Sequence, residues 1–126
     1  MKQKINELEI NGTIYVPKNS VNTQAINTDG LPLVMIRTYS AGVFYGYLNK
    51  KESTLAGMEV ELIEARRVWQ WSGAASLSQL AMEGTKNLDG CKMPQKVNSI
   101  VLIAIEIISM TENAYNSLEE VSIWKK

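Results

Sequence analysis

The sequence predicts a small α+β protein, in which an antiparallel sheet is joined by one short central helix and a C-terminal helix. β-prone runs separated by glycine-containing turns predict the sheet. The length of 126 residues suits one domain, and 45% apolar with 21% charged residues is typical of a globular chain. We expect residues 1–32 to form an N-terminal hairpin and tether, and residues 33–126 a single core domain.

The N-terminal segment predicts a β-hairpin. Residues 8–16 read LEINGTIYV, in which Asn-Gly separates two β-prone runs, the pattern of a tight hairpin turn. Pro17 ends this hairpin. The polar sequence of residues 18–32 is typical of a surface loop or tether.

Three or four antiparallel strands are expected between residues 33 and 71. LVMIRTY and VFYGYL flank the turn Ser40–Gly42, and an exposed connection over residues 50–57 leads into MEVELIEARRVWQW at residues 58–71. In this last strand the apolar residues change from one face to the other. Because a one-residue shift reverses the faces of a strand, we expect a bulge or bend near residues 63–65.

The second half of the chain predicts two helices with a strand between them. The central helix has Ser76 as its N-terminal cap and Gly84 as its end. The β-branched run Ser99–Ser109 predicts a buried strand. A terminal helix is expected from Thr111, followed by a tail that Trp124 anchors.

The composition excludes several classes of function. The chain contains no histidine, the usual general base and the commonest metal ligand, and the lone Cys91 offers neither a disulfide nor a cysteine metal cluster. Lys+Arg and Asp+Glu are both 13, which does not favour DNA binding. No signal peptide is recognisable, and the apolar run of residues 100–105 is too short to cross a membrane. We therefore expect no metal, no cofactor and no membrane, in an intracellular setting.

The arginines are segregated from the ten scattered lysines. All three lie in the strand block: Arg37, Arg66 and Arg67. Arginine suits planar recognition of phosphate, and the two-residue spacing of Arg67, Trp69 and Trp71 places a guanidinium and two indoles on one strand face. That combination suits a phosphate and a stacked base. Alternatively, the tryptophans belong to the core and Arg67 pairs with Glu61 or Glu64.

Three other positions leave two interpretations open. The turn at Ser40 offers a hydroxyl to a ligand, or is a plain hairpin turn. The helix start at Ser76 presents backbone N–H groups that favour anions, although no Walker or Rossmann motif is present. Glu106, inside an apolar run, either faces solvent or is buried beside an arginine.

Several motifs together resemble one family. The strings IRTYSAGVFYGYL, EVELIEARRVWQWSGAASLSQLAMEGTKN and IVLIAIEII with TENA are similar to small phage and prophage proteins in which RTYSAGV, ARR-(aromatic)-W and GAASLSQLA recur. The resemblance covers residues 33–124, and INGTIYVPKNSV also resembles the family's N-terminal arm. We identify this family as the first-described type of Thoeris anti-defence protein, a phage sponge.

The resemblance implies a binding protein and not an enzyme. In the Thoeris system a bacterial TIR-domain protein converts NAD into a cyclic ADP-ribose isomer that activates a killing effector, and the sponge holds that nucleotide intact. Members form homo-oligomers built from dimers with ligand pockets at subunit interfaces, and some hold cyclic oligonucleotides in separate pockets. The implied location is the cytoplasm of the infected host cell.

The resemblance and the residue chemistry together suggest roles for eight residues. An indole would stack on the adenine, from Trp69 or Trp71. A guanidinium would hold the phosphates, from Arg37, Arg66 or Arg67. A small polar side chain would bond the ribose hydroxyls, from Ser40, Ser76 or Asn87. The alternative is a structural protein of the phage particle, or an inhibitor that binds a host protein through its aromatic segment, with no small-molecule ligand.

Overall fold

The computed structural model describes residues 8–10, 13–15, 24–27 and 29–125, and its first element is a short hairpin. Strands β1 (Leu8–Ile10) and β2 (Thr13–Tyr15) pair antiparallel, as the sequence predicts. The predicted turn, residues 11–12, and most of the predicted tether, residues 16–23, lie outside the described residues.

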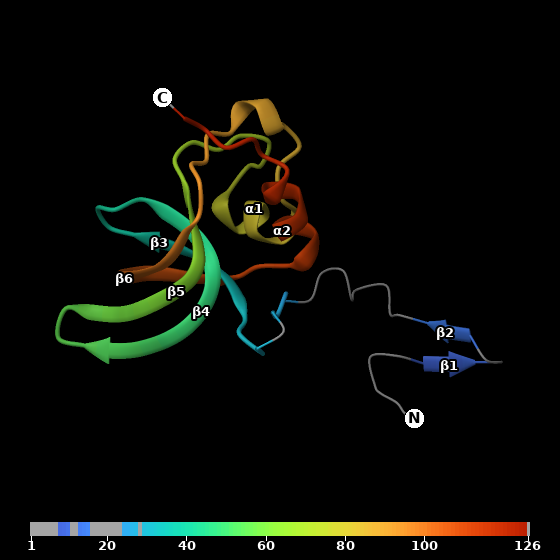
Figure 1. Ribbon diagram of the computed structural model, residues 1–126, viewed down its shortest axis with the longest axis horizontal. Coiled ribbons are helices and arrows are strands. Elements are labelled where there is room, and N and C mark those ends of the chain that lie inside the picture. The colour runs from blue at the N-terminus through green and yellow to red at the C-terminus, as the bar shows by residue number, and fades with distance from the viewer. Residues whose placement is uncertain (1–7, 11–12, 16–23, 28, 126) are drawn as a thin grey trace.

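Four further strands close into a small antiparallel barrel (Figure 1). They are β3 (Leu33–Thr38), β4 (Val43–Thr54), β5 (Gly57–Val68) and β6 (Val97–Ser109). Each strand pairs with the next one along the chain, and pairing of β3 with β6 closes the ring. The antiparallel sheet is confirmed, whereas its closure is a feature that the sequence analysis did not predict.

The predicted irregularity of β5 is a bulge at Glu64. The register between β4 and β5 shifts across Tyr45–Tyr47, and Glu64 adopts a left-handed conformation with φ 53°. Opposite the bulge, a Cβ on Gly46 would lie 3.1 Å from the Ala65 Cα, so the close approach of the two strands favours glycine. After the bulge, Ala65 and Arg66 are both buried although they point to opposite sides of the sheet.

Two apolar cores lie on the two sides of the sheet. The barrel interior is filled by eight buried side chains: Val34, Ile36, Phe44, Val60, Leu62, Ala65, Leu102 and Ala104. The outer face of the sheet packs with the helices on a second cluster, which includes Leu33, Met35, Tyr45, Leu80, Met93 and Leu118. Strand β3 is therefore buried on both faces, because its successive side chains alternate between the two cores.

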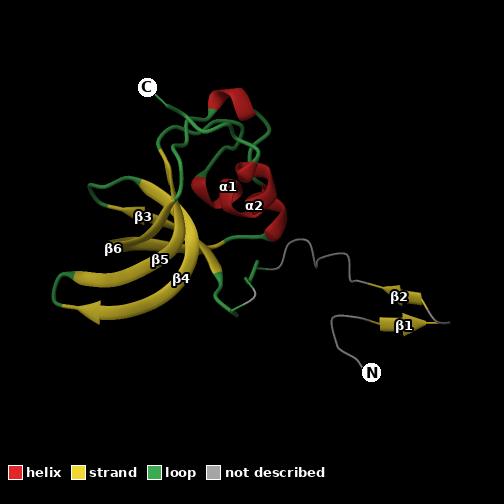
Figure 2. Ribbon diagram, viewed as in Figure 1, coloured by secondary structure: helices red, strands yellow, loops and turns green. Residues whose placement is uncertain are grey.

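Both helices lie on one side of the barrel, α1 (Leu77–Glu83) and α2 (Glu112–Glu119) (Figure 2). A side-chain hydroxyl caps the start of each helix: Ser76 accepts a hydrogen bond from the backbone N–H of Gln79, and Thr111 accepts one from that of Ala114. The sequence predicts both of these helix starts. Gly84 ends α1 with φ 78°, which is also as predicted. Among the residues described, neither helix is long and apolar enough to cross a membrane.

Two predicted boundaries and one predicted burial pattern need correction. Strand β4 continues to Thr54, because the predicted connection pairs with β5 and only its last residues form the turn. Strand β5 ends at Val68, so the segment that carries the tryptophans lies beyond it. Strand β6 is buried on one face only, because its other face exposes Val101, Ile103 and Ile105.

Residues before position 33 also contribute to the core. Ala25 is buried in the helix-side cluster, its N–H donates to the Met110 carbonyl at 2.9 Å, and its carbonyl accepts from the Leu33 N–H at 2.8 Å. Gln24 forms a bridge with Thr111. The packed core therefore begins earlier in the chain than the boundary expected at residue 33.

Candidate functional site

The guanidinium of Arg66 is buried and fully hydrogen-bonded. Arg66 is 4% exposed, and each of its five N–H groups has a protein acceptor. These acceptors are the carbonyls of Met93, Pro94, Leu118 and Val121 and the hydroxyl of Tyr45. Arg66 therefore ties β5 to the C-terminal end of α2 and has no N–H left to donate to a phosphate.

Arg67 lies on the opposite face of β5, at one end of the barrel. Its guanidinium stands 4.3 Å from the centroid of the Phe44 ring and donates to the carbonyl of Ala41. Ala41 belongs to the same exposed turn as Ser40, so the structure brings Arg67 close to the backbone of that turn. Arg67 pairs with neither Glu61 nor Glu64.

Arg37 is engaged in an ion pair at the surface. Its Nε donates to Glu106 Oε1 at 2.9 Å, with side chains 49% and 40% exposed. Glu106 is thus half-exposed and also beside an arginine. The three arginines do not converge on one site, because Arg66 and Arg67 are successive strand residues that face opposite ways, and Arg37 is held by its own partner.

The two predicted tryptophans also separate. Trp71 packs against the helix-side core, whereas Trp69 is 62% exposed and stacks on Trp124, with ring centroids 6.2 Å apart and planes 6° from parallel. The ammonium of Lys92 lies 5.7 Å from the centroid of the Trp124 ring. The predicted single face of Arg67, Trp69 and Trp71 is wrong, because the chain leaves β5 at Val68.

Short backbone bridges hold this aromatic pair in place. The N–H of Trp69 donates to the Lys92 carbonyl at 3.0 Å, and the N–H of Trp124 donates to the Met93 carbonyl at 2.9 Å. Three chain segments that are far apart in the sequence therefore lie side by side. We call Trp69, Lys92 and Trp124 the tryptophan site; it confirms the predicted anchoring of the tail by Trp124.

A hollow of about 280 Å³ adjoins the tryptophan site and reaches the short 3₁₀ turn η2 (Leu88–Gly90). Its lining residues are Leu88, Asp89, Cys91, Glu120, Ser122, Ile123 and Trp124. The two carboxylates and the hydroxyl are hydrogen-bonding groups suited to sugar hydroxyls. Within the described ranges, no group of three or more carboxylate or thiol side chains is placed to hold a metal ion.

Ser76 and Asn87 do not join the tryptophans. The hydroxyl of Ser76 is occupied as the cap of α1. The Asn87 amide donates to the Ser72 hydroxyl at 3.3 Å, and its backbone N–H donates to Thr85 Oγ1 at 2.9 Å. Asn87 immediately precedes the η2 residues that line the hollow, so along the chain it lies nearer to the hollow than Ser76 does.

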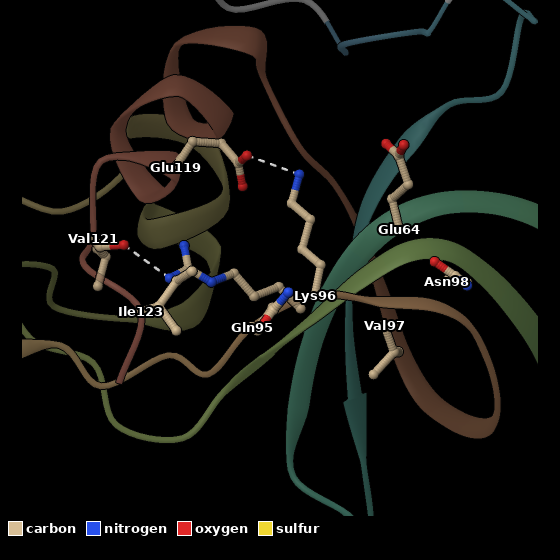
Figure 3. A pocket seen from close by; sticks show the side chains of 9 residues that line it. Glu64, Gln95, Lys96, Val97, Asn98, Glu119, Val121 and Ile123 are labelled. Atoms are coloured by element: carbon tan, nitrogen blue, oxygen red, sulfur yellow. Dashed lines mark hydrogen bonds and ion pairs between the residues drawn. The ribbon is translucent and has the colours of Figure 1, made fainter. Parts of the chain in front are cut away.

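A larger cavity, of about 470 Å³, opens on the other side of Ile123 (Figure 3). Its lining residues are Glu64, Arg66, Gln95, Lys96, Val97, Asn98, Glu119, Val121 and Ile123. Figure 3 shows Lys96 reaching toward Glu119 at one side of the cavity, with Glu64 and Asn98 at the opposite side. Of the eight residues predicted to bind a ligand, only Arg66 lines this cavity.

Phenolic groups hold the charged side chains of the cavity wall in a hydrogen-bonded network. Lys96 Nζ lies 2.8 Å from Glu119 Oε1 and donates to the Tyr115 hydroxyl at 2.9 Å, while the Tyr45 hydroxyl donates to Glu119 Oε2 at 2.5 Å. Burial and the bond to Glu119 raise the pKa of Tyr45 well above its usual range. Burial acts to raise the pKa of Glu119, but the hydrogen bonds and charges of Lys96, Tyr45 and Arg66 outweigh it and lower that pKa.

Lys92 and Lys96 are site residues that were not predicted from the sequence. Both lie in the loop before β6, where isolated lysines resemble ordinary solvated charge. The placement of Lys92 depends on a bridge between Gln70 and Lys92, for which no local sequence pattern exists. Trp124, which the sequence suggested as the anchor of the tail, was the signal that could have pointed to the tryptophan site.

Residues 31–118 match a family described as Domain of unknown function (DUF6948). The chain belongs to this family. The matched range includes the barrel, α1, all of α2 but its last residue Glu119, and Lys92, whereas Trp124 lies beyond it. No curated protein and no solved structure matches the chain.

Proposed function

We propose that this protein is a phage anti-defence sponge, which binds a cyclic ADP-ribose isomer made by a TIR-domain protein and sequesters it without degrading it. In the cytoplasm of an infected cell this would block Thoeris immunity. The observation that carries the proposal is the exposed Trp69–Trp124 stack with the Lys92 ammonium beside it. The resemblance of the central motifs to the sponge family gives independent support.

The chemistry of the ligand matches the groups at the tryptophan site. A cyclic ADP-ribose isomer has an adenine, two riboses and a pyrophosphate with two negative charges. The exposed face of Trp69 stacks on the adenine, and Lys92 pairs with the pyrophosphate. Asp89 and Ser122 in the adjoining hollow accept hydrogen bonds from ribose hydroxyls.

The composition supports sequestration over turnover. The chain has no histidine to move a proton near neutral pH, and holding a nucleotide intact requires no proton transfer. We therefore propose a binding protein and not an enzyme, with no metal or cofactor.

The required affinity indicates that more than one subunit contributes. A nanomolar dissociation constant corresponds to about 12 kcal/mol, whereas one base stacked on an aromatic ring contributes about 1–3 kcal/mol. Trp69 is 62% exposed, so a ligand on it would be covered from one side only. We propose that a homo-oligomer built from dimers encloses the ligand, and that related cyclic nucleotides are further candidate ligands.

The test is recovery of intact nucleotide after release. The protein is incubated with the cyclic ADP-ribose isomer, free ligand is removed by filtration, and the protein is denatured by heat before the released nucleotide is identified by mass. We expect stoichiometric retention and an unaltered mass. No depletion of free ligand by micromolar protein would overturn the proposal, and a chemically altered nucleotide would replace it with a degrading enzyme.

Matched variants connect this test to the tryptophan site. Trp69→Ala removes the stacking surface and should weaken retention about tenfold to a hundredfold. Lys92→Met should weaken it about tenfold, whereas Lys51→Met, an exposed lysine on β4, should leave it unchanged. Equal retention by the Lys92 and Lys51 variants would exclude Lys92 from the site.

The second candidate function is a structural or host-protein-binding protein with no small-molecule ligand. It is favoured by the apolar row Val101, Ile103 and Ile105, which β6 exposes to solvent. If the nucleotide is not retained, loss of binding to a host protein on Ile103→Lys substitution would support this alternative.

A further inference from the structure

The cavity beside Lys96 combines a charged inner wall with an apolar rim, separately from the tryptophan site. Arg66, Lys96 and Glu119 form the inner wall, and Val97 and Ile123 lie at the rim, exposed by 48% and 50%. A volume of about 470 Å³ lies within the ordinary range of small-molecule sites. The cavity can therefore hold a compact organic molecule.

The inner wall carries one net positive charge. Lys96 and Glu119 form an ion pair at 2.8 Å and neutralise each other. Arg66 donates only to neutral carbonyls and a hydroxyl, and among the described residues it forms no ion pair. Because Arg66 is 4% exposed, water screens its charge poorly, and this positive charge acts on the inner wall. Glu64, at the opposite side, brings the charged lining residues of the whole cavity to a net charge of zero.

Lys96 can donate a direct hydrogen bond to an anionic ligand. An ammonium has three N–H groups, and Lys96 donates two of them, to Glu119 and to the Tyr115 hydroxyl. Figure 3 shows the Lys96 side chain rising along the cavity between Glu119 and Glu64. The remaining N–H is available to an anionic oxygen in the cavity, and the side chain is 29% exposed, so it can be reached.

The other lining residues favour a ligand whose body is largely apolar. Val97, Val121 and Ile123 offer apolar contact, and the amides of Gln95 and Asn98 offer neutral hydrogen bonds at the mouth. Glu64 carries a negative charge at the opposite side, which opposes a second anionic group there.

We propose that this cavity binds a small organic monoanion, with one carboxylate or sulfonate-like head on Lys96 and an apolar body against Val97 and Ile123. This proposal does not depend on the nucleotide-binding function, because the two sites lie on either side of Ile123 and use different cations.

The test uses two fluorescent probes that differ in one charged group. 1-Anilinonaphthalene-8-sulfonate carries a single negative charge on an apolar body, and N-phenyl-1-naphthylamine has the same rings without the sulfonate. Fluorescence titration of the full chain should show one saturable site that binds the sulfonate about tenfold or more tighter than the neutral probe. Equal affinities would overturn the proposal, because the charge would then not be recognised.

Two variants on one face of β6 locate the site. Val97→Glu adds a negative charge at the cavity rim and should weaken binding of the sulfonate at least about tenfold. Val101→Glu adds the same charge further along the strand, outside the cavity, and should change the affinity less than about twofold. Equal loss in both variants would overturn the proposal by placing the probe on the exposed apolar row of β6.

A third variant examines the charged head directly. Lys96→Met should weaken binding of the sulfonate at least about tenfold and leave the affinity for the neutral probe unchanged. Circular dichroism of the variant confirms that it is folded. Unchanged sulfonate binding would exclude Lys96. Trp124→Ala should leave both probes unaffected, so failure of nucleotide retention and failure of this proposal are distinguishable.

Discussion

The tryptophan site and the cavity beside Lys96 are built from the same two stretches of chain but treat their cations differently. Both draw on the loop before β6 and on the residues after α2, and Ile123 lines a hollow on each side. At the tryptophan site, Lys92 lies over an exposed ring. In the cavity, Arg66 and Lys96 are held in a hydrogen-bonded network. The difference separates Arg66, whose N–H groups are all engaged in the fold, from Lys92 and Lys96, which can still reach a ligand.

The largest expected difference between the two regions is in stability. Arg66→Met removes a donor from four carbonyls, of which those of Met93 and Leu118 keep a backbone N–H, and should lower the free energy of unfolding by about 3–5 kcal/mol. Lys92→Met should change it by less than about 0.5 kcal/mol, because Lys92 is exposed. Urea unfolding of both variants measures the contrast. A loss below about 1 kcal/mol for Arg66→Met would mean that water replaces the guanidinium without penalty.

An intermediate effect is expected for Glu119, and it depends on pH. Its pKa is lowered from 4.5 in the folded protein, so its ionised form stabilises the fold above that value, and the contribution is lost as pH falls through the folded pKa. Glu119→Gln should lower the free energy of unfolding by about 1–2 kcal/mol at neutral pH and flatten the loss of stability in acid. The control is Glu120→Gln, which removes an exposed neighbour. The measurement is the urea midpoint of each protein across the acid range. If the midpoints of both variants changed with pH as those of the parent protein do, the prediction would be contradicted.

The smallest expected effect is the loss of the aromatic pair. Trp124→Ala removes the stack with Trp69 and should lower the free energy of unfolding by about 0.5–1 kcal/mol, because an exposed aromatic pair contributes little beyond its buried area. The same urea measurement tests it. A loss as large as that of Arg66→Met would show that the tail is part of the core and not chiefly a binding surface.

Local sequence signals predicted the parts of the fold that depend on neighbouring residues. The caps Ser76 and Thr111, the stop at Gly84 and the bulge at Glu64 each follow from a hydroxyl, a glycine or a change of apolar parity within a few positions. The closure of β3 on β6 was not predicted, because it joins strands about seventy residues apart, as in the pairing of Arg37 with Glu106.

The candidate site was predicted only in part, for the same reason. Trp69 was one of two tryptophans, with Trp71, that the sequence suggested for stacking on a base, but its partner Trp124 and the neighbouring cation Lys92 reach it through long-range bridges. Arg66 was misjudged because an arginine on a strand gives no sign of whether carbonyls surround it. The burial that makes it structural is a property of the packing of α2 against the sheet.

The closed ring of β3, β4, β5 and β6 restricts how a partner can attach to this sheet. Each strand of the ring has a neighbour on each side, but the pairing is not continuous along the strands. Residues 49–54 of β4 and residues 97–103 of β6 pair with β5 alone. Assembly by strand addition is therefore disfavoured where both neighbours are present, and only the stretches that lack one neighbour offer backbone groups to an incoming strand. Elsewhere on the ring a partner must be recognised by side chains, which directs attention to the surface positions where aromatic or aliphatic groups stand free.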